Sequence, residues 1–270
     1  LYGFGQAEGI LGEFLRNKRD KVTVATKFGL EASGSMAKSR KLVSIARWLA
    51  HRSKFIAKFA RRSSSNAISA GKFNPTDAQA SLTTSLRELG TDHIDLFLLH
   101  ECTIANAQQP DLIAFLEAQV AKGTIRAFGP SSGFAKLGDD AAAYPATCSI
   151  LQFDSNTLEP NIEKLRNRDL RMCITFGPIQ GAGKLASLVK ASPEAAAPFE
   201  TLLGAPLSNP DVLAGFLLRD ALARNNDGIV LFASTKPQRV TANIATATTI
   251  QSPPEHIEVF REFVRAVSRP

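Results

Sequence analysis

The stretch SLRELGTDHIDLFLLH, residues 85–100, is the part of the sequence that decides the fold. A helical pattern ends at Leu89, and Gly90 occupies the position where a left-handed glycine commonly terminates a helix. The apolar run Ile94–His100 then has the length and composition of a buried strand. Short β-branched or aromatic runs alternate with helical patterns along the whole chain. This alternation is typical of βα units and a parallel sheet.

Six strands and seven helices are expected from this pattern. The strands are predicted at Val22–Phe28, Ile94–His100, Ile125–Gly129, Ser149–Asp154, Met172–Phe176 and Ile229–Ala233. The helices are predicted at Ala7–Asn17, Thr76–Leu89, Asp111–Lys122, Ile162–Asn167, Asn209–Arg224, Pro237–Thr249 and His256–Val267. No GxGxxG motif follows a strand, which disfavours an open dinucleotide-binding sheet. We therefore predict an α/β fold, the (β/α)8 TIM barrel.

Closure of such a barrel requires more strands than the sequence shows. Six strands would leave two edges with unpaired backbone groups, whereas the barrel has eight. We expect the first two strands and the first helix to precede Leu1, on roughly 40 to 60 further residues. The 270 residues, of which 44% are hydrophobic, are expected to form a single barrel domain over residues 1–270.

The net charge of +7 is concentrated in one segment, residues 31–75. This segment holds ten basic residues against one acid, for a net charge of +9, which leaves −2 for the rest of the chain. We therefore expect no nucleic-acid partner. The segment is interpreted as a basic loop and helix insertion at the catalytic face, amphipathic over Arg40–Arg62. Three roles stay open for it: packing on the barrel, covering the substrate, or binding an anionic membrane or acidic partner.

The apolar runs and the cysteines indicate in which cellular compartment the protein resides. The longest apolar runs are of strand length and far short of the roughly 18 residues that a membrane span needs. The three cysteines are odd in number and lack CxxC spacing, which predicts neither a disulfide framework nor a zinc site. We expect a cytoplasmic protein without a membrane span or a bound metal.

Three polar residues stand where the predicted units place a barrel's active site. Tyr2 lies in LYGFGQAE just before a helix, Lys27 ends the strand VTVATKFG, and His100 ends the strand IDLFLLH. A strongly hydrated ammonium is unusual at the end of a buried strand unless it has a function at the open end of the barrel. These positions make the three residues candidates for catalysis.

These motifs resemble those of the aldo-keto reductase family, which has a tyrosine-glycine start, a VATK strand and a DLFLLH strand. The run SLRELGTDHID is similar to the family's SLxxLGxDxID stretch, and the resemblance extends over essentially the whole chain. It implies hydride transfer between NADPH and a carbonyl compound or sugar, with Tyr2, Lys27 and His100 as catalytic residues. It also implies an aspartate partner for Lys27, five residues before Tyr2 and therefore before Leu1.

Carbonyl reduction explains why these residue types occur together. The alkoxide that forms as hydride arrives must be protonated by a nearby group. A phenol with a pKa of about 10 is a weak acid, and an ammonium such as that of Lys27 favours the phenolate and lowers this pKa. His100 can orient the carbonyl and assist the proton.

The resemblance further implies residues that hold the nicotinamide. Ser131, Ser132 and Gln152 correspond to a serine, an asparagine and a glutamine that bind its amide, with Ser132 in place of the asparagine. Phe176 corresponds to an aromatic residue, usually tyrosine, that stacks on the nicotinamide ring. Stacking is retained by this exchange, but the hydroxyl contact is lost.

A second cofactor site is predicted after the last strand, in ASTKPQRVTAN, residues 233–243. The stretch resembles the family's site for the adenosine phosphate. Pro237 suits the first position of a helix, whose N-terminus attracts anions. The residues expected to bind the 2′-phosphate of NADPH are Ser234, Lys236, Arg239 and Asn243.

One alternative function remains open from the sequence alone. A nicotinamide-binding regulatory module would keep the barrel and the cofactor but turn over little or no substrate. The sequence identifies neither the substrate, nor the direction of the reaction, nor the oligomeric state.

Overall fold

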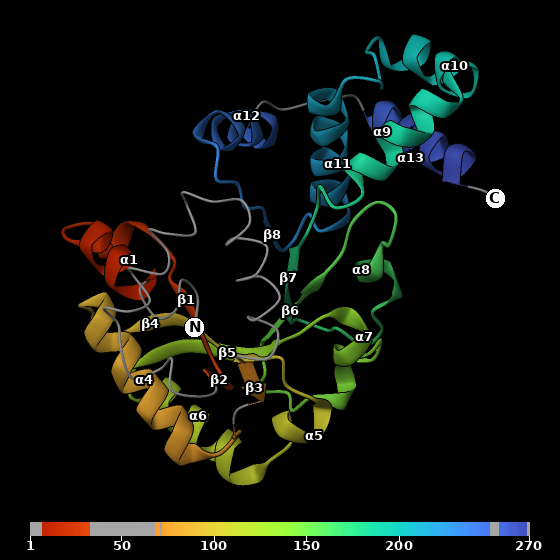
Figure 1. The fold of residues 1–270 in the computed structure, drawn as a ribbon. Coiled ribbons are helices and arrows are strands. Elements are labelled where there is room, and N and C mark those ends of the chain that lie inside the picture. The colour runs from red at the N-terminus through yellow and green to blue at the C-terminus, as the bar shows by residue number, and fades with distance from the viewer. Residues whose placement is uncertain (1–6, 33–67, 71, 249–253, 269–270) are drawn as a thin grey trace. The chain divides into compact units, whose positions relative to one another are not determined.

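The computed structural model describes residues 7–32, 68–70, 72–248 and 254–268 (Figure 1). The chain divides into two compact units. Unit 1 comprises Leu1–Ser131 and Ala143–Ser149, and unit 2 comprises Ser132–Ala142 and Ile150–Pro270. Each unit contains three of the six expected strands, so we describe the two separately.

Unit 1 is built on three parallel strands in the order β1 (Ala25–Phe28), β4 (Ile94–His100) and β5 (Ile125–Ser131). Its helices are α1 (Ala7–Leu15), the 3-10 turn η2 (Arg19–Lys21), α4 (Pro75–Leu89), the short α5 (Ile104–Ala107) and α6 (Pro110–Ala121). Strands β2 (Leu30–Ala32) and β3 (Ile68–Ala70) form a separate antiparallel pair. Residues 33–67, which connect these two strands, are outside the described ranges. The helix predicted over Arg40–Arg62 falls within them.

The ends of α4 follow from its capping residues. The Asn74 side chain accepts a hydrogen bond from the Asp77 backbone N–H at 2.9 Å, and Pro75 occupies the first helical position. At the other end Gly90 has a φ of 64°, in the left-handed region that glycine adopts without steric cost. The helix end predicted at Leu89 is confirmed.

Asp95 connects the strands of unit 1 at their amino ends. It is 4% exposed, and its carboxylate accepts the Val24 N–H at 2.8 Å and pairs with Arg19 at 2.8 Å and Arg126 at 3.0 Å. The strand predicted to begin at Val22 begins instead at Ala25. The reason is that η2 precedes it and the Val24 N–H is bound by a side chain rather than by a neighbouring strand.

Unit 2 has the parallel strand order β6 (Ile150–Asp154), β7 (Met172–Phe176) and β8 (Ile229–Leu231). Its helices are α7 (Phe134–Leu137), α8 (Asn161–Lys164), α9 (Ala182–Ala191), α10 (Pro193–Leu203), α11 (Pro210–Arg224), α12 (Pro237–Thr248) and α13 (Pro254–Ser268). A further 3-10 turn, η4 (Ala141–Ala143), lies in sequence where the two units meet.

Several predicted boundaries are wrong by a few residues. Strand β5 continues beyond Gly129 to Ser131, whose carbonyl accepts the Glu101 N–H at 2.8 Å. Strand β6 starts one residue later than predicted, and β8 ends two residues earlier. The helix predicted over residues 162–167 is only the single turn α8, because the Arg166 backbone bonds to the segment 139–141 instead.

Helices α9 and α10 were not predicted at all. They pack with α11 and α13 into a helical cluster with its own apolar core (Figure 1). In this core Phe216 stacks on Phe260 with ring centroids 5.1 Å apart, and Phe263 is fully buried. Prolines at positions 193 and 198 divide the stretch and hide its helical periodicity.

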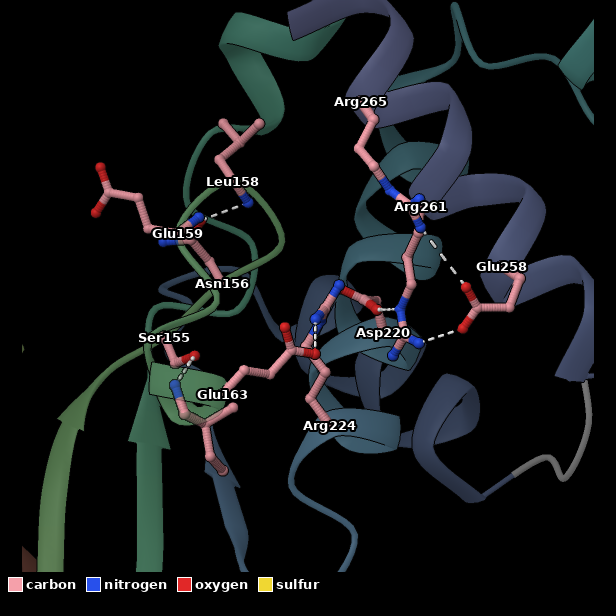
Figure 2. A network of polar contacts seen from close by, with 11 residues as sticks. Ser155, Asn156, Leu158, Glu159, Glu163, Asp220, Arg224, Glu258, Arg261 and Arg265 are labelled. Carbon is pink, nitrogen blue, oxygen red and sulfur yellow. Dashed lines mark hydrogen bonds and ion pairs between the residues drawn. The ribbon is translucent and has the colours of Figure 1, made fainter. Parts of the chain in front are cut away.

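Asp220, on α11, holds a polar network inside unit 2 (Figure 2). Its side chain is 0% exposed and binds Arg261 of α13 at 2.5 Å and Arg224 at 2.9 Å. Arg224 also pairs with Glu163 of α8, and Arg261 with Glu258 of α13. The network therefore joins the C-terminal helix α13 to α11 and to the helix that follows β6.

Candidate active site

In unit 1, the strand register places three candidate residues on one face of the sheet. Lys27 is in register with Leu98, and His100 with Ser131, and side chains in register on parallel strands point to the same face. Thr26 points to the opposite face, where its hydroxyl donates to Glu8 of α1 at 2.6 Å. Lys27, His100 and Ser131 therefore share the face turned away from α1.

All three residues lie at the carboxyl ends of their strands. Ser131 is 2% exposed, whereas Lys27 and His100 are partly exposed. Burial lowers the pKa of Lys27 below its ordinary value, and the negative charge of Glu101 acts in the opposite direction and raises it. The Lys27 ammonium is therefore poorly hydrated, and the nearby Glu101 carboxylate favours its charged form.

Tyr2, the proposed proton donor, lies outside the described residues. The same holds for most of the basic segment 31–75, of which the structure describes the side chains of residues 72–75. The structure therefore brings together Lys27, His100 and Ser131, while the position of Tyr2 relative to them stays a prediction.

In unit 2, the nicotinamide candidates Gln152 and Phe176 share one face of the sheet. Gln152 is in register with Ile174, and Asp154 with Phe176, two residues further along each strand. Thr175 points to the other face, where its hydroxyl accepts a hydrogen bond from Asn225 at the end of α11. The candidates therefore face away from α11.

Ser132 is bound directly to the strand that carries Gln152. The Ser132 N–H donates to the Gln152 carbonyl at 3.1 Å, and the two residues are 1% and 2% exposed. The hydroxyl of Ser132 and the side-chain amide of Gln152 provide both donors and acceptors. Phe176 is partly exposed.

Two further polar residues at strand ends were not identified from the sequence. Asp154 accepts the Phe134 N–H at 2.7 Å and the Asn161 amide at 3.2 Å, so it ties the loops after Ser132 and after β6 to each other. Glu101 directly follows His100 and acts on Lys27. Lys27 and His100 were identified as polar residues at the ends of strands, and the same signal could have identified Asp154 and Glu101.

The phosphate candidates lie around the start of α12. The Ser234 hydroxyl accepts the Lys236 N–H at 3.1 Å, and the Lys236 carbonyl accepts the N–H groups of Arg239 and Val240. Lys236 and Arg239 are exposed, and Ser234 and Asn243 are partly exposed. Arg239 and Asn243 are four residues apart on the helix and therefore share a face.

Within the described ranges, no three His, Cys, Asp or Glu side chains are grouped as metal ligands would be. Among the helices of those ranges, none combines the length and apolar character of a membrane span.

Comparisons with known proteins agree with this architecture. The sequence profile described as "Aldo/keto reductase family" matches residues 1–185. An aldo-keto reductase from Bacillus halodurans in its holo form is similar in structure, with 18% identity, coverage of 97% of this chain and 80% of that chain, and a TM-score of 0.65. A glycerol dehydrogenase from Gluconobacter oxydans shows 19% identity, coverage of 100% and 80%, and a TM-score of 0.67.

At this level of identity the structural likeness concerns the fold. It confirms the predicted fold class, the (β/α)8 barrel. Among curated proteins, the sequence comparison finds no match.

Proposed function

The chain belongs to the aldo/keto reductase family, and from this premise we propose that it is an NADPH-dependent oxidoreductase. It would reduce an aldehyde or ketone, or oxidise the corresponding alcohol or sugar. The observation that carries the proposal is the shared face of Lys27, His100 and Ser131 at the carboxyl ends of neighbouring parallel strands. Barrel enzymes carry out their chemistry at this end of the sheet.

The chain's own residues have distinct roles in this proposal. Tyr2 protonates the carbonyl oxygen during reduction and removes the proton during oxidation. The Lys27 ammonium favours the Tyr2 phenolate electrostatically, so the hydroxyl exchanges its proton more readily near neutral pH. His100 donates a hydrogen bond that orients the carbonyl oxygen.

The donor set in the described residues fits a nicotinamide dinucleotide. Hydroxyls of Ser131 and Ser132 and the amide of Gln152 would hold the carboxamide, and the ring of Phe176 would cover the nicotinamide face. When bound, NADPH supplies the hydride. Ser131, Ser132 and Gln152 are buried, so few water molecules compete with the carboxamide for their hydrogen bonds.

A preference for NADPH over NADH is proposed from the start of α12. Lys236 and Arg239 are exposed cations at the N-terminal turn of a helix, where acidic side chains are normally favoured. A phosphate would be stabilised both by the helix N-terminus and by these cations, together with Ser234 and Asn243. We further propose a location in the reducing cytoplasm, since the buried Cys102, Cys148 and Cys173 form no disulfide.

The oxidation of NADPH by a panel of aldehydes and ketones, followed by its absorbance, tests the proposed reaction. The Tyr2→Phe variant should lose about 10²–10⁴-fold in kcat with its NADPH affinity nearly unchanged, because the hydroxyl acts on the substrate oxygen. Lys27→Met should behave in the same way. Tight NADPH binding without turnover in the full-length protein would instead favour a regulatory module, and an unchanged rate in Tyr2→Phe would remove the proposed acid.

Cofactor preference is tested by the dissociation constants of NADPH and NADH. The parent should bind NADPH at least about tenfold more tightly, because each charge-assisted phosphate contact contributes about 1.5–3 kcal/mol. Arg239→Ala should weaken the binding of NADPH and leave the dissociation constant of NADH nearly unchanged. Equal affinities in the parent, or equal losses for both cofactors in the variant, would contradict the assignment.

A further inference from the structure

Glu101 occupies an unusual backbone conformation beside a candidate catalytic residue. It directly follows His100 and has a φ of 55°, in the left-handed region that residues other than glycine, asparagine and aspartate seldom adopt. Its N–H donates to the Ser131 carbonyl at 2.8 Å, which holds the strained peptide at the carboxyl ends of β4 and β5. Such conformations persist where the surrounding structure holds them, and they cluster at functional sites.

The end of β1 passes close to the same peptide. Gly29 has a φ of 105°, and a Cβ atom added to it would lie 3.3 Å from the His100 carbonyl oxygen. Lys27 precedes Gly29 by two residues, and its strand is in parallel register with β4 up to Phe28 and Leu99. The chain segments that carry Lys27 and Glu101 therefore run side by side where their strands end.

A carboxylate near the end of β1 affects the charge of the Lys27 amine. Burial disfavours the charged form of the amine, and among the described residues Glu101 is the group whose charge favours it. Among the described residues of β1, β4 and β5, the other titratable group on this sheet face is His100, from β4.

On the basis of the proposed function, we propose that Glu101 is an anionic partner of Lys27 and a positioning residue for carbonyl reduction. The carboxylate keeps the buried amine as an ammonium and holds it at the carboxyl ends of the strands. Only the ammonium form favours the Tyr2 phenolate, so Glu101 acts on proton transfer through Lys27. The left-handed backbone at position 101 serves to place the carboxylate beside the end of β1.

Direct titration of Lys27 tests the pair without any turnover. The full-length protein is labelled with acetic anhydride at a series of pH values, and the acetylation of Lys27 is measured by peptide mass spectrometry. In Glu101→Gln the midpoint should fall by about 0.5–1 pH unit relative to the parent, because the uncompensated burial releases the proton more readily. Glu101→Asp should restore most of the shift. An unchanged midpoint in Glu101→Gln would overturn the proposal.

Two variants separate loss of charge from loss of structure. Glu101→Gly removes the carboxylate while glycine adopts the left-handed backbone without strain, so its Lys27 midpoint should match that of Glu101→Gln. Asp92→Asn removes a carboxylate that is 94% exposed and precedes the amino end of β4, so it should leave the midpoint unchanged. A midpoint at the parent value in Glu101→Gly, or a shift in Asp92→Asn as large as in Glu101→Gln, would contradict a specific Glu101 effect.

The pH profile of kcat gives the functional arm. In Glu101→Gln the alkaline limb should move to lower pH by the same amount as the Lys27 midpoint, with kcat near the parent value at lower pH. A parent that reduces no carbonyl, together with a shifted Lys27 midpoint, would refute the proposed function and leave the pair intact. An active parent whose profile and Lys27 midpoint are unaffected by Glu101→Gln would refute the pair alone.

Discussion

Each unit of the protein contains a buried aspartate bound by two arginines, but the two clusters connect very different parts of the chain. In unit 1, Asp95 joins the amino ends of β1, β4 and β5, and its partners are Arg19 of η2 and Arg126 of β5. In unit 2, Asp220 joins helices α11 and α13 and, through Arg224, the short helix α8 (Figure 2).

The difference lies in how much water reaches each cluster. The Arg126 side chain is 66% exposed, so one side of the Asp95 cluster is screened by solvent. The Asp220 side chain is 0% exposed, and those of Arg224 and Arg261 are 10% and 19% exposed. Ion pairs at a surface contribute little to the free energy of unfolding. Removing one partner of a buried pair is destabilising, because it leaves an uncompensated charge. The two clusters should therefore respond differently to the same kind of substitution.

The largest effect is expected for Asp220→Ala. Its loss removes the buried carboxylate that Arg224 and Arg261 share and leaves them only the more exposed Glu163 and Glu258, so it should reduce the free energy of unfolding by about 3–5 kcal/mol. Urea denaturation measures this value. The matched control is Asp227→Ala, whose side chain is 60% exposed and pairs with Arg168, and which should change stability little. Similar losses in the two variants would show that burial does not distinguish the pairs.

A smaller effect is expected for Asp95→Asn, about 2 kcal/mol in the free energy of unfolding. The amide oxygen can still accept the Val24 N–H, and the exposed Arg126 can be solvated, so mainly Arg19 loses a charge partner. Denaturation of this variant beside Asp220→Ala compares the clusters directly. A loss in Asp95→Asn greater than in Asp220→Ala would reverse the proposed ranking.

Acid should weaken the Asp95 cluster in a predictable window. Burial raises the pKa of Asp95, but the Val24 hydrogen bond and the charges of Arg19 and Arg126 together lower it below its usual value. The carboxylate therefore contributes stability above the unfolded pKa of about 3.9, and this contribution is lost as the pH falls towards the folded pKa. Below about pH 4, the parent should lose stability more steeply than Asp95→Asn, by at most about 1.4 kcal/mol per pH unit. Urea midpoints at several acidic pH values measure the two slopes, and parallel slopes would contradict this assignment.

The smallest effect is expected for Arg126→Met, about 0.5 kcal/mol, because this arginine is largely solvated. Arg261→Met removes a partner of Asp220 whose side chain is only 19% exposed, against 66% for Arg126, and should cost about 2 kcal/mol. Thermal or urea denaturation of both variants sharpens the comparison at the level of single arginines. Equal losses would indicate that the arginines of the two clusters are equivalent.

The sequence by itself determined the repeating βα architecture and the candidate residues at strand ends. The strand Ile94–His100 is apolar apart from Asp95 and His100 because both faces of a parallel sheet are covered, and this composition is visible without a structure. Gly90 marks a helix end because the left-handed conformation there favours glycine. Lys27 and His100 could be selected because polar groups at the ends of such strands are conspicuous.

Only the tertiary structure decided which distant residues meet. The helices α9 and α10 owe their stability to a core shared with α11 and α13, so local patterns interrupted by proline did not predict them. The pairing of Asp220 with Arg261 spans 41 residues, and the effect of Glu101 on Lys27 arises from the alignment of two strand ends. Burial and electrostatic coupling depend on neighbours brought together by the fold, and no spacing along the chain encodes them.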